Sequence, residues 1–254
     1  MKFSPSSNPK HLEVITKPTS RGLIFKSDAE LLKSLKSLPD EINFDVPDGE
    51  FNTILYLAAA NNYVKTADYL LFEKKVNPNI KVSENLTAAH IAAAKGHHEV
   101  LRKLVDCEGI KLAEKDKYGE TPLFRAIGNA PTEKLLDIVR LIVMTDASTI
   151  SVTNEDGISP IELALQRQHL SVIQLLLEHG ADVSKRCSSA AAGMMMSRST
   201  PSSKFDGAFV FFTGSAENDN LRQCAKLIIE AYNKQHLAAD LKETTSSSSF
   251  GFTQ

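Results

Sequence analysis

The chain has 254 residues, 42% of them hydrophobic and 24% charged, which is enough for one sizeable core or for a stack of small units. Its 29 basic residues nearly balance its 31 acidic residues, so no overall positive field would hold nucleic acid or an anionic membrane surface. No apolar run in the sequence approaches the roughly 20 residues that a membrane-spanning helix requires. We therefore expect a globular chain whose partner is another protein.

The cysteines and the N-terminus indicate a reducing, cytoplasmic compartment. Cys107, Cys187 and Cys224 lie far apart and form no Cys-x-x-Cys pair, so they neither frame disulfides nor build a zinc site. The polar, proline-containing start lacks the apolar stretch of a secretion signal. We expect residues 1–26 to form a disordered tail. Residues 27–47 contain a predicted helix with leucines on one face and lysines on the other.

Four similar blocks follow this helix, and each begins with a threonine or a serine. Their offsets along the chain are 34, 34 and 38 residues, and a second amphipathic run with paired apolar residues follows each block. Self-similarity at such a period indicates repeats, each built of a turn, a short helix, a second turn and a longer helix. The blocks are "TILYLAAANNY" from Thr53, "TAAHIAAAKGH" from Thr87, "TPLFRAIGNA" from Thr121 and "SPIELALQRQH" from Ser159.

These blocks resemble the ankyrin repeat family, whose pattern contains Thr-Pro-Leu-His, Gly-His and Gly-Ala-Asp. Asp116, Gly119 and residues 121–123 match this pattern in the third block, and residues 180–182 match it in the fourth. The chain departs from the pattern where Ile54 and Ala88 replace proline, Phe124 and Glu162 replace histidine, and Asn62 replaces glycine. The resemblance implies an all-α ankyrin-repeat solenoid with repeats at about residues 48–81, 82–115, 116–153 and 154–183.

The residue types fit this architecture physically. A threonine or serine can cap the first turn of each short helix, and a proline one position later loses no hydrogen bond there. Alanines such as Ala58 and Ala92 allow short helices to approach closely, while leucines such as Leu70 and Leu104 fill the space between units. Because a single unit cannot bury its apolar face, its stability comes from stacking on its neighbours.

Three histidines in the second block, His90, His97 and His98, raise the question of a metal site. The resemblance implies that His90 ties adjacent turns together by hydrogen bonds and that His97 follows the glycine between the two helices. His98 is expected to face solvent. A zinc site would need a further ligand such as Cys107, whose place on the second helix does not let it converge easily with a turn histidine. We therefore expect no metal ion and no other cofactor.

Caps are expected at both ends of the solenoid. Residues 27–47 are interpreted as an N-terminal capping half-repeat, and residues 206–236 as a degenerate C-terminal capping repeat whose "AFVFF" stretch is either buried or an exposed binding strand. Residues 184–205 are rich in small and polar side chains and are expected to form a flexible insertion. Residues 237–254 are expected to form a disordered tail.

Partner binding in such a solenoid is expected on the concave face, which turn tips and the exposed edge of the short helices build. At least one carboxylate on each tip, with apolar residues between them, predicts a groove for a partner segment with basic residues and an apolar anchor. Ordinary solvated charges would explain the same pattern. The candidate partner-binding residues are Glu50, Asn52, Asn61, Glu84, Leu86, Lys95, Lys117, Tyr118, Glu120, Glu155, Asp156, Ile158 and Arg167.

The sequence carries no recognisable catalytic motif. It has no Gly-x-Ser-x-Gly elbow, no phosphate-binding glycine loop and no His-Glu-x-x-His. Cys224 has no histidine beside it in the sequence to activate it, so a structural thiol is the better interpretation. We expect a monomeric, non-catalytic protein-binding scaffold.

The C-terminal stretch "ADLKETTSSSSFGFTQ" resembles the translocation signals of bacterial type IV-secreted effectors, which tend to carry acidic and small polar residues and an apolar residue near the end. This resemblance implies an effector that is translocated into a host cell and binds a host protein there. A disordered serine linker explains the same residues. Three alternatives stay open: a cytosolic eukaryotic-type adaptor, an adaptor that bridges two partners, and an effector with a separate activity in residues 184–232.

Overall fold

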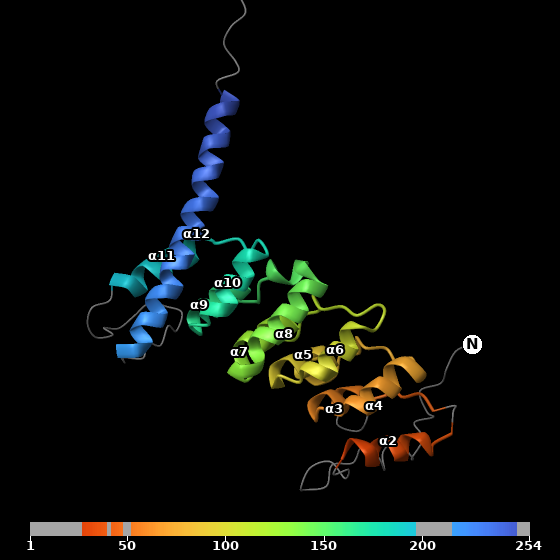
Figure 1. Cartoon of the computed structure of the whole chain (residues 1–254). Helices are drawn as coiled ribbons and strands as arrows, with labels where there is room; N and C mark the ends of the chain where they lie inside the picture. The colour runs from red at the N-terminus through yellow and green to blue at the C-terminus, as the bar shows by residue number, and fades with distance from the viewer. Residues whose placement is uncertain (1–26, 40–41, 48–51, 197–214, 248–254) are drawn as a thin grey trace, which may run out of the picture. The chain divides into compact units, whose positions relative to one another are not determined.

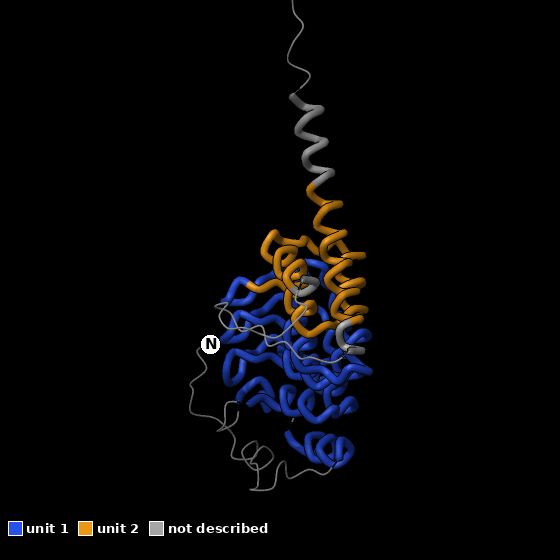
Figure 2. Tube along the Cα trace, turned by 90° about the vertical axis from the view of Figure 1, so that its left-hand side faces the viewer, with its two compact units in different colours: residues 1–157 blue, residues 158–254 orange. Residues whose placement is uncertain are grey.

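The computed structural model describes residues 27–39, 42–47, 52–196 and 215–247, and within these ranges the chain forms helices and turns but no β-strand (Figure 1). The predicted all-α class is confirmed. The chain divides into two compact units, residues 1–157 and residues 158–254 (Figure 2). Each unit is described by itself.

The described part of unit 1, residues 1–157, contains one leading helix followed by three helix pairs. The leading helix is α2, Asp28–Lys36, and the first helix of each pair is short. The pairs are α3 (Ile54–Ala60) with α4 (Val64–Asp68), α5 (Ala88–Lys95) with α6 (His98–Val105), and α7 (Pro122–Asn129) with α8 (Thr132–Thr145). Shorter turns are η1 (Tyr69–Glu73), which extends α4, η2 (Ser83–Asn85) and η3 (Ala147–Ile150).

The helices of unit 1 form two rows. The short helices α3, α5 and α7 pack in order as an inner row, and α2, α4, α6 and α8 pack in order as an outer row (Figure 1). Ala58 of α3 and Ala92 of α5 are completely buried, which lets the inner helices approach closely. Leu70 and Leu104 are completely buried as well. The burial predicted for the alanines of the short helices and for the leucines of the second helices is therefore confirmed at these four positions.

A threonine or serine precedes each of the four short helices, as predicted, but Thr121 does not cap its helix. The Thr53 hydroxyl accepts a hydrogen bond from the Tyr56 backbone N–H at 3.2 Å, and the Ser159 hydroxyl accepts one from the Glu162 N–H at 3.4 Å. Thr121 forms no such bond, and its buried Oγ1 has no hydrogen-bond partner in the described part of the chain. The α7 start relies instead on Pro122, whose fixed φ suits the first helical position.

In the described part of unit 1, two positions between paired helices have a left-handed backbone. Gly96 has a φ of 72°, and a Cβ there would lie 2.8 Å from Cδ of Pro131, so glycine is required on both counts. Asn62 takes the corresponding place in the first pair with a φ of 58°. Asparagine tolerates this conformation better than most residues, which explains why its replacement of glycine leaves the turn intact.

An aspartate joins helix α2 to α4, its neighbour in the outer row. Leu31 and Leu35 are buried, and the Asp28 carboxylate accepts hydrogen bonds from the backbone N–H groups of Lys65 and Thr66 at 2.8 and 2.9 Å. These N–H groups lie in the first turn of α4, which has no partner for them within the helix. Asp28 therefore both begins α2 and caps α4. The role of residues 27–47 as a capping half-repeat stays a prediction.

Unit 2, residues 158–254, contains α9 (Pro160–Gln166), α10 (Leu170–Glu178), α11 (Lys185–Met196) and α12 (Ser215–Ser247). Helix α9 packs on α10, α11 packs on α12, and α12 also contacts α10.

The helices of unit 2 differ from the sequence expectation at two places. Residues 185–196, expected within a flexible insertion, form α11, because Cys187 and Ala191 lie one turn apart and are both buried. Residues 237–247, expected to be disordered, form the last turns of α12, whose sequence contains neither glycine nor proline to end it. The final helix pair is therefore α11 with α12, and the "AFVFF" stretch lies outside the described residues.

Replacing Leu104 with alanine is expected to reduce the free energy of unfolding of unit 1 by about 2–5 kcal/mol, because the fully buried side chain would leave a cavity between α6 and its neighbours. Met144→Ala on α8 is the control, since this side chain is 72% exposed and its loss should change the free energy by less than about 0.5 kcal/mol. Equilibrium urea denaturation measures both values. Equal effects of the two substitutions would contradict the described core.

Candidate partner-binding face

The turn tips of unit 1 are joined by backbone hydrogen bonds into one row, here called the tip row: residues 83–86, 116–120 and 154–156. The Lys117 N–H donates to the Glu84 carbonyl at 2.9 Å, and the Glu155 N–H donates to the Tyr118 carbonyl at 3.1 Å. At Gly119, with a φ of 72°, a Cβ would lie 2.7 Å from the Glu155 nitrogen. Glycine therefore permits the close approach of the second and third tips.

A buried carboxylate organises the middle tip. Asp116 is buried, and its Oδ1 accepts hydrogen bonds from the backbone N–H groups of Tyr118 at 2.8 Å and Glu120 at 3.0 Å. Its Oδ2 accepts a hydrogen bond from Arg125 Nε at 2.6 Å, and the same guanidinium lies 3.1 Å from Glu120 Oε2. The buried charge is thus paired and hydrogen-bonded, which fixes the backbone on both sides of Tyr118.

Tyr118 presents the exposed aromatic ring of the tip row. Its side chain is 49% exposed, with Lys117 Nζ 4.7 Å and the Arg125 guanidinium carbon 5.4 Å from the ring centroid. Both distances fall within the range of cation–π attraction, which restrains the ring. A rigid, exposed aromatic side chain is the kind of residue that dominates protein interfaces.

The carboxylates of the tip row fall into two groups. Glu84 forms an ion pair with Lys117, whereas Glu120 shares the Arg125 guanidinium with the buried Asp116. Glu155 and Asp156 are exposed and form no ion pair within the described residues. The exposed carboxylates of the row that have no ion pair therefore lie at the third tip.

His90 connects the second repeat to the tip row, as the sequence predicted. Its Nδ1 accepts a hydrogen bond from the Thr87 backbone N–H at 3.1 Å, and its Nε2 lies 3.0 Å from the Glu120 carbonyl oxygen. A carbonyl can only accept, so Nε2 carries the proton of a neutral imidazole. Burial lowers the pKa of His90 to about 4. Protonation of Nδ1 would turn this acceptor into a donor, which would then face the Thr87 N–H, itself a donor.

Phe124 and Glu162, which replace this histidine in the third and fourth repeats, have different consequences. Phe124 is buried and offers no acceptor, which accounts for the unpaired Thr121 hydroxyl of the third repeat. Glu162, in unit 2, accepts hydrogen bonds from Ser184 Oγ at 2.7 Å and Arg186 Nη2 at 2.6 Å. Burial alone would raise the pKa of Glu162, but these two donors hold it below its ordinary value. The glutamate therefore links its repeat to the residues that lead into α11.

The predicted site residues do not form a single surface. Glu84, Lys117, Tyr118, Glu120 and Glu155 come together in the tip row with Leu86 and Asp156. Asn61 and Lys95 lie away from this cluster, since they bond backbone carbonyls at the opposite ends of short helices. Asn52 is half-buried before α3, Glu50 lies outside the described residues, and Ile158 and Arg167 belong to unit 2.

One functional candidate, Arg125, was missed at the sequence level. It lies on α7 and contacts Asp116, Glu120 and Tyr118. Its position, four residues after Thr121, puts it one helical turn above the tip, and this spacing was the available signal.

The two cysteines of unit 2 are buried thiols. Cys224 and Cys187 are buried in unit 2, and burial raises their pKa values to about 11 and about 12, so both thiols stay protonated at neutral pH. No group of three histidine, cysteine or acidic side chains in the described ranges could hold a metal ion. None of the described helices is both long and apolar enough to cross a membrane.

Comparison with known proteins identifies the helix pairs. The family described as "Ankyrin repeats (3 copies)" matches residues 55–152, and the family described as "Ankyrin repeat" matches residues 156–188, so the two cover just over half of the chain. The crystal structure of EF0377, an ankyrin repeat protein, has a TM-score of 0.53 at 23% identity and covers 61% of this chain and 77% of that chain. This structural likeness supports the fold alone.

Two curated relatives share the repeat region. The chain is 27% identical over 176 residues to the nuclear factor NF-kappa-B p105 subunit of Gallus gallus, which covers 68% of this chain and 16% of the relative. It is 30% identical over 134 residues to the ankyrin repeat and SAM domain-containing protein 6 of Danio rerio, which covers 52% of this chain and 17% of the relative. The chain thus spans about a sixth of the length of these two relatives.

His90 is expected to make the stability of unit 1 depend on pH. Its folded pKa of about 4 lies below the ordinary value of 6.5, so the unfolded chain binds the proton first as the pH falls. The free energy of unfolding that the neutral His90 contributes is fully present above pH 6.5. It falls by on the order of 2–3 kcal/mol as the pH is lowered toward 4. His90→Gln keeps a side-chain donor but does not titrate. The difference between the unfolding free energies of the two proteins should change across this window, and parallel pH curves would contradict the assignment.

Proposed function

Because the chain belongs to the ankyrin repeat family, we propose that it is a non-catalytic scaffold that binds a partner protein through the tip row centred on Tyr118. Proteins of this family generally bind other proteins rather than catalyse reactions. The observation that supports the proposal most is that Tyr118 is exposed and yet held by a buried ion pair on its own tip.

The physical advantage of this arrangement is preorganisation. Binding costs the entropy of fixing exposed side chains, and a side chain that is already fixed avoids most of that cost. The buried Asp116 carboxylate fixes the backbone of Tyr118, and Lys117 and Arg125 restrain its ring. A partner that contacts the ring therefore gains the free energy of burying it without the entropy cost of ordering the tip.

The partner segment that suits the tip row carries an apolar side chain and a basic side chain. Two cations of the chain itself already lie over the Tyr118 ring, so the partner contributes apolar contact there rather than another cation. Its basic residue pairs with the unneutralised carboxylates of Glu155 and Asp156. Glu84 and Glu120, engaged in internal pairs, set the geometry of the row.

Tyr118→Ala is expected to weaken binding of a captured partner by more than about 1 kcal/mol at both low and high salt, because an apolar anchor is not screened by ions. Phe72→Ala is the matched control, since Phe72 is another exposed aromatic residue of unit 1 but belongs to the outer row. Partners are obtained by affinity capture from cell lysate, and affinities are measured by titration calorimetry. Equal losses for both variants, or no loss for Tyr118→Ala, would reject the proposal.

Charge reversal at Glu155 and Asp156 is expected to lower the association rate for the same partner by at least about tenfold at low salt and much less at high salt. The same reversal at Glu133 and Asp137 on α8, both exposed, is the control. Surface plasmon resonance separates association from dissociation. An effect confined to dissociation, or equal in both double variants, would exclude electrostatic attraction to the third tip.

The C-terminal tail supports a more specific setting for this function, in which the chain is an effector translocated into a host cell. The support for this setting is the resemblance of the terminal sequence to type IV translocation signals. Residues 248–254 lie outside the described residues. Deleting residues 248–254 leaves α12 complete and should abolish transfer of a fused reporter into host cells without changing thermal unfolding. Unchanged transfer would leave a cytosolic adaptor as the setting.

A further inference from the structure

The outer row of unit 1 contains a hollow with a strongly basic rim, here called the lysine groove. It has a volume of about 460 Å³ and is lined by Ala29, Leu32, Lys33, Lys36, Ser37 and Lys65. We propose that the lysine groove is a second interaction site, which binds an acidic segment of a partner protein that also carries apolar side chains. No residue of this groove belongs to the tip row, so the inference is independent of the proposed function.

The groove has fixed walls. It lies between α2 and α4, and the Asp28 carboxylate joins these helices through the Lys65 and Thr66 N–H groups and the Thr66 hydroxyl, the last at 2.6 Å. Leu31 and Leu35 anchor α2 from the buried side. Leu32 is half-buried and remains available to a ligand. The site is therefore formed before binding, as most ligand sites are.

The positive charge of the groove is largely unneutralised. Lys33 and Lys65 form no ion pair within the described part of unit 1, and Lys36 approaches Glu73 only at 3.7 Å. No carboxylate lines this hollow. A ligand that supplies carboxylates therefore gains attraction without displacing an internal pair at Lys33 or Lys65.

A neighbouring hollow of about 310 Å³ extends the groove along the outer row. It shares Leu32, Lys36 and Lys65 with the first hollow and reaches Lys103 of α6. Its acidic residues are already engaged, since Asp68 lies 2.7 Å from Lys103 and Glu73 is the partner of Lys36. The shared lining makes the surface long enough for an extended segment rather than for one small group.

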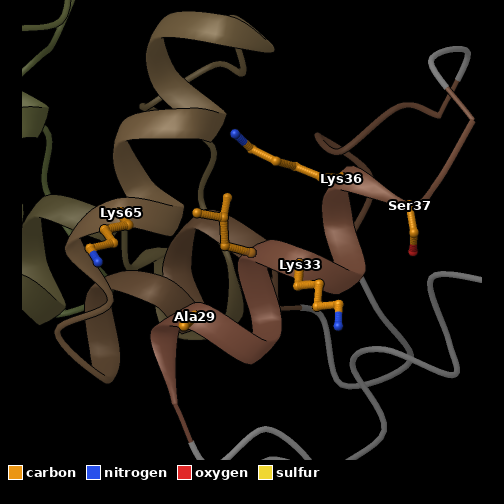
Figure 3. A pocket seen from close by; sticks show the side chains of 6 residues that line it. Ala29, Lys33, Lys36, Ser37 and Lys65 are labelled. Carbon is orange, nitrogen blue, oxygen red and sulfur yellow. The ribbon is translucent and has the colours of Figure 1, made fainter.

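The placement of the lysines favours a peptide over a single phosphate. Figure 3 shows the side chains of Lys33, Lys36 and Lys65 ending at separate points around the hollow, with Ala29 between Lys33 and Lys65. A phosphate would need donors that converge on one point. Separate ammonium groups instead match carboxylates spaced along a chain, while Ala29 and Leu32 accept an apolar side chain.

The experiment uses the full chain and a fluorescein-labelled peptide of about ten residues in which glutamates alternate with leucines. Fluorescence anisotropy is expected to show binding that weakens with added salt, and the same peptide with glutamine in place of glutamate should not bind. Lys33→Glu combined with Lys65→Glu should weaken binding at least about tenfold. The control is Lys134→Glu combined with Arg140→Glu, which makes the same charge change on exposed residues of α8 and should alter affinity less than about twofold.

Circular dichroism melting checks that both double variants remain folded. Equal weakening of peptide binding in the two double variants would attribute the effect to net charge alone and overturn the proposal. Failure of the acidic peptide to bind the unmodified chain would overturn it as well. A chain that binds no peptide but binds vesicles containing phosphatidylserine, and loses this vesicle binding in the groove variant alone, would assign the groove to membranes instead. Competition by inorganic phosphate at constant ionic strength would indicate an anion site and would also overturn it.

Discussion

The close approach of neighbouring short helices is the constraint on which unit 1 depends. Ala58 and Ala59 of α3 and Ala92 and Ala93 of α5 are completely buried, and side chains this small let short helices approach closely. At this spacing the tips that precede successive helices come within hydrogen-bonding distance, as the Lys117 N–H and the Glu84 carbonyl do. The proposed binding face is thus positioned by the core rather than by the tips themselves.

Local pairing, rather than net charge, decides what each surface offers. The whole chain has a formal net charge of −2, which suggests no preference for a partner. In unit 1, however, Glu155 and Asp156 are unneutralised on the tip row, and Lys33 and Lys65 are unneutralised on the outer row. One unit therefore presents an acidic and a basic surface, and two partners of opposite charge could be held at once. This arrangement is compatible with an adaptor that bridges two proteins.

The sequence was sufficient to predict the features that arise within one repeat. The helix pairs and the buried alanines follow from residues close together in sequence whose spacing repeats, whereas the contact of His90 with the next repeat was implied by the family resemblance alone. It was insufficient where partners come from different elements: the pairing of Glu84 with Lys117 removes a carboxylate that the sequence counted as available. Helix α11 was missed because its buried face consists of Cys187 and Ala191, residues too small to give a clear apolar pattern. Position in the chain also did not reveal that Asn61 and Lys95 lie away from the tips.

The central claim is that the tip row is ordered before any partner binds, and amide hydrogen exchange of the free protein tests it most directly. The Lys117 and Glu155 amides bond across tips, and the Tyr118 and Glu120 amides bond to Asp116. These four amides should exchange at least about a hundredfold more slowly than an unstructured peptide, and Asp116→Ala should remove the protection at Tyr118 and Glu120. Exchange of all four at the unstructured rate in the unmodified chain would contradict the account, because the tip would then have to be ordered by its partner.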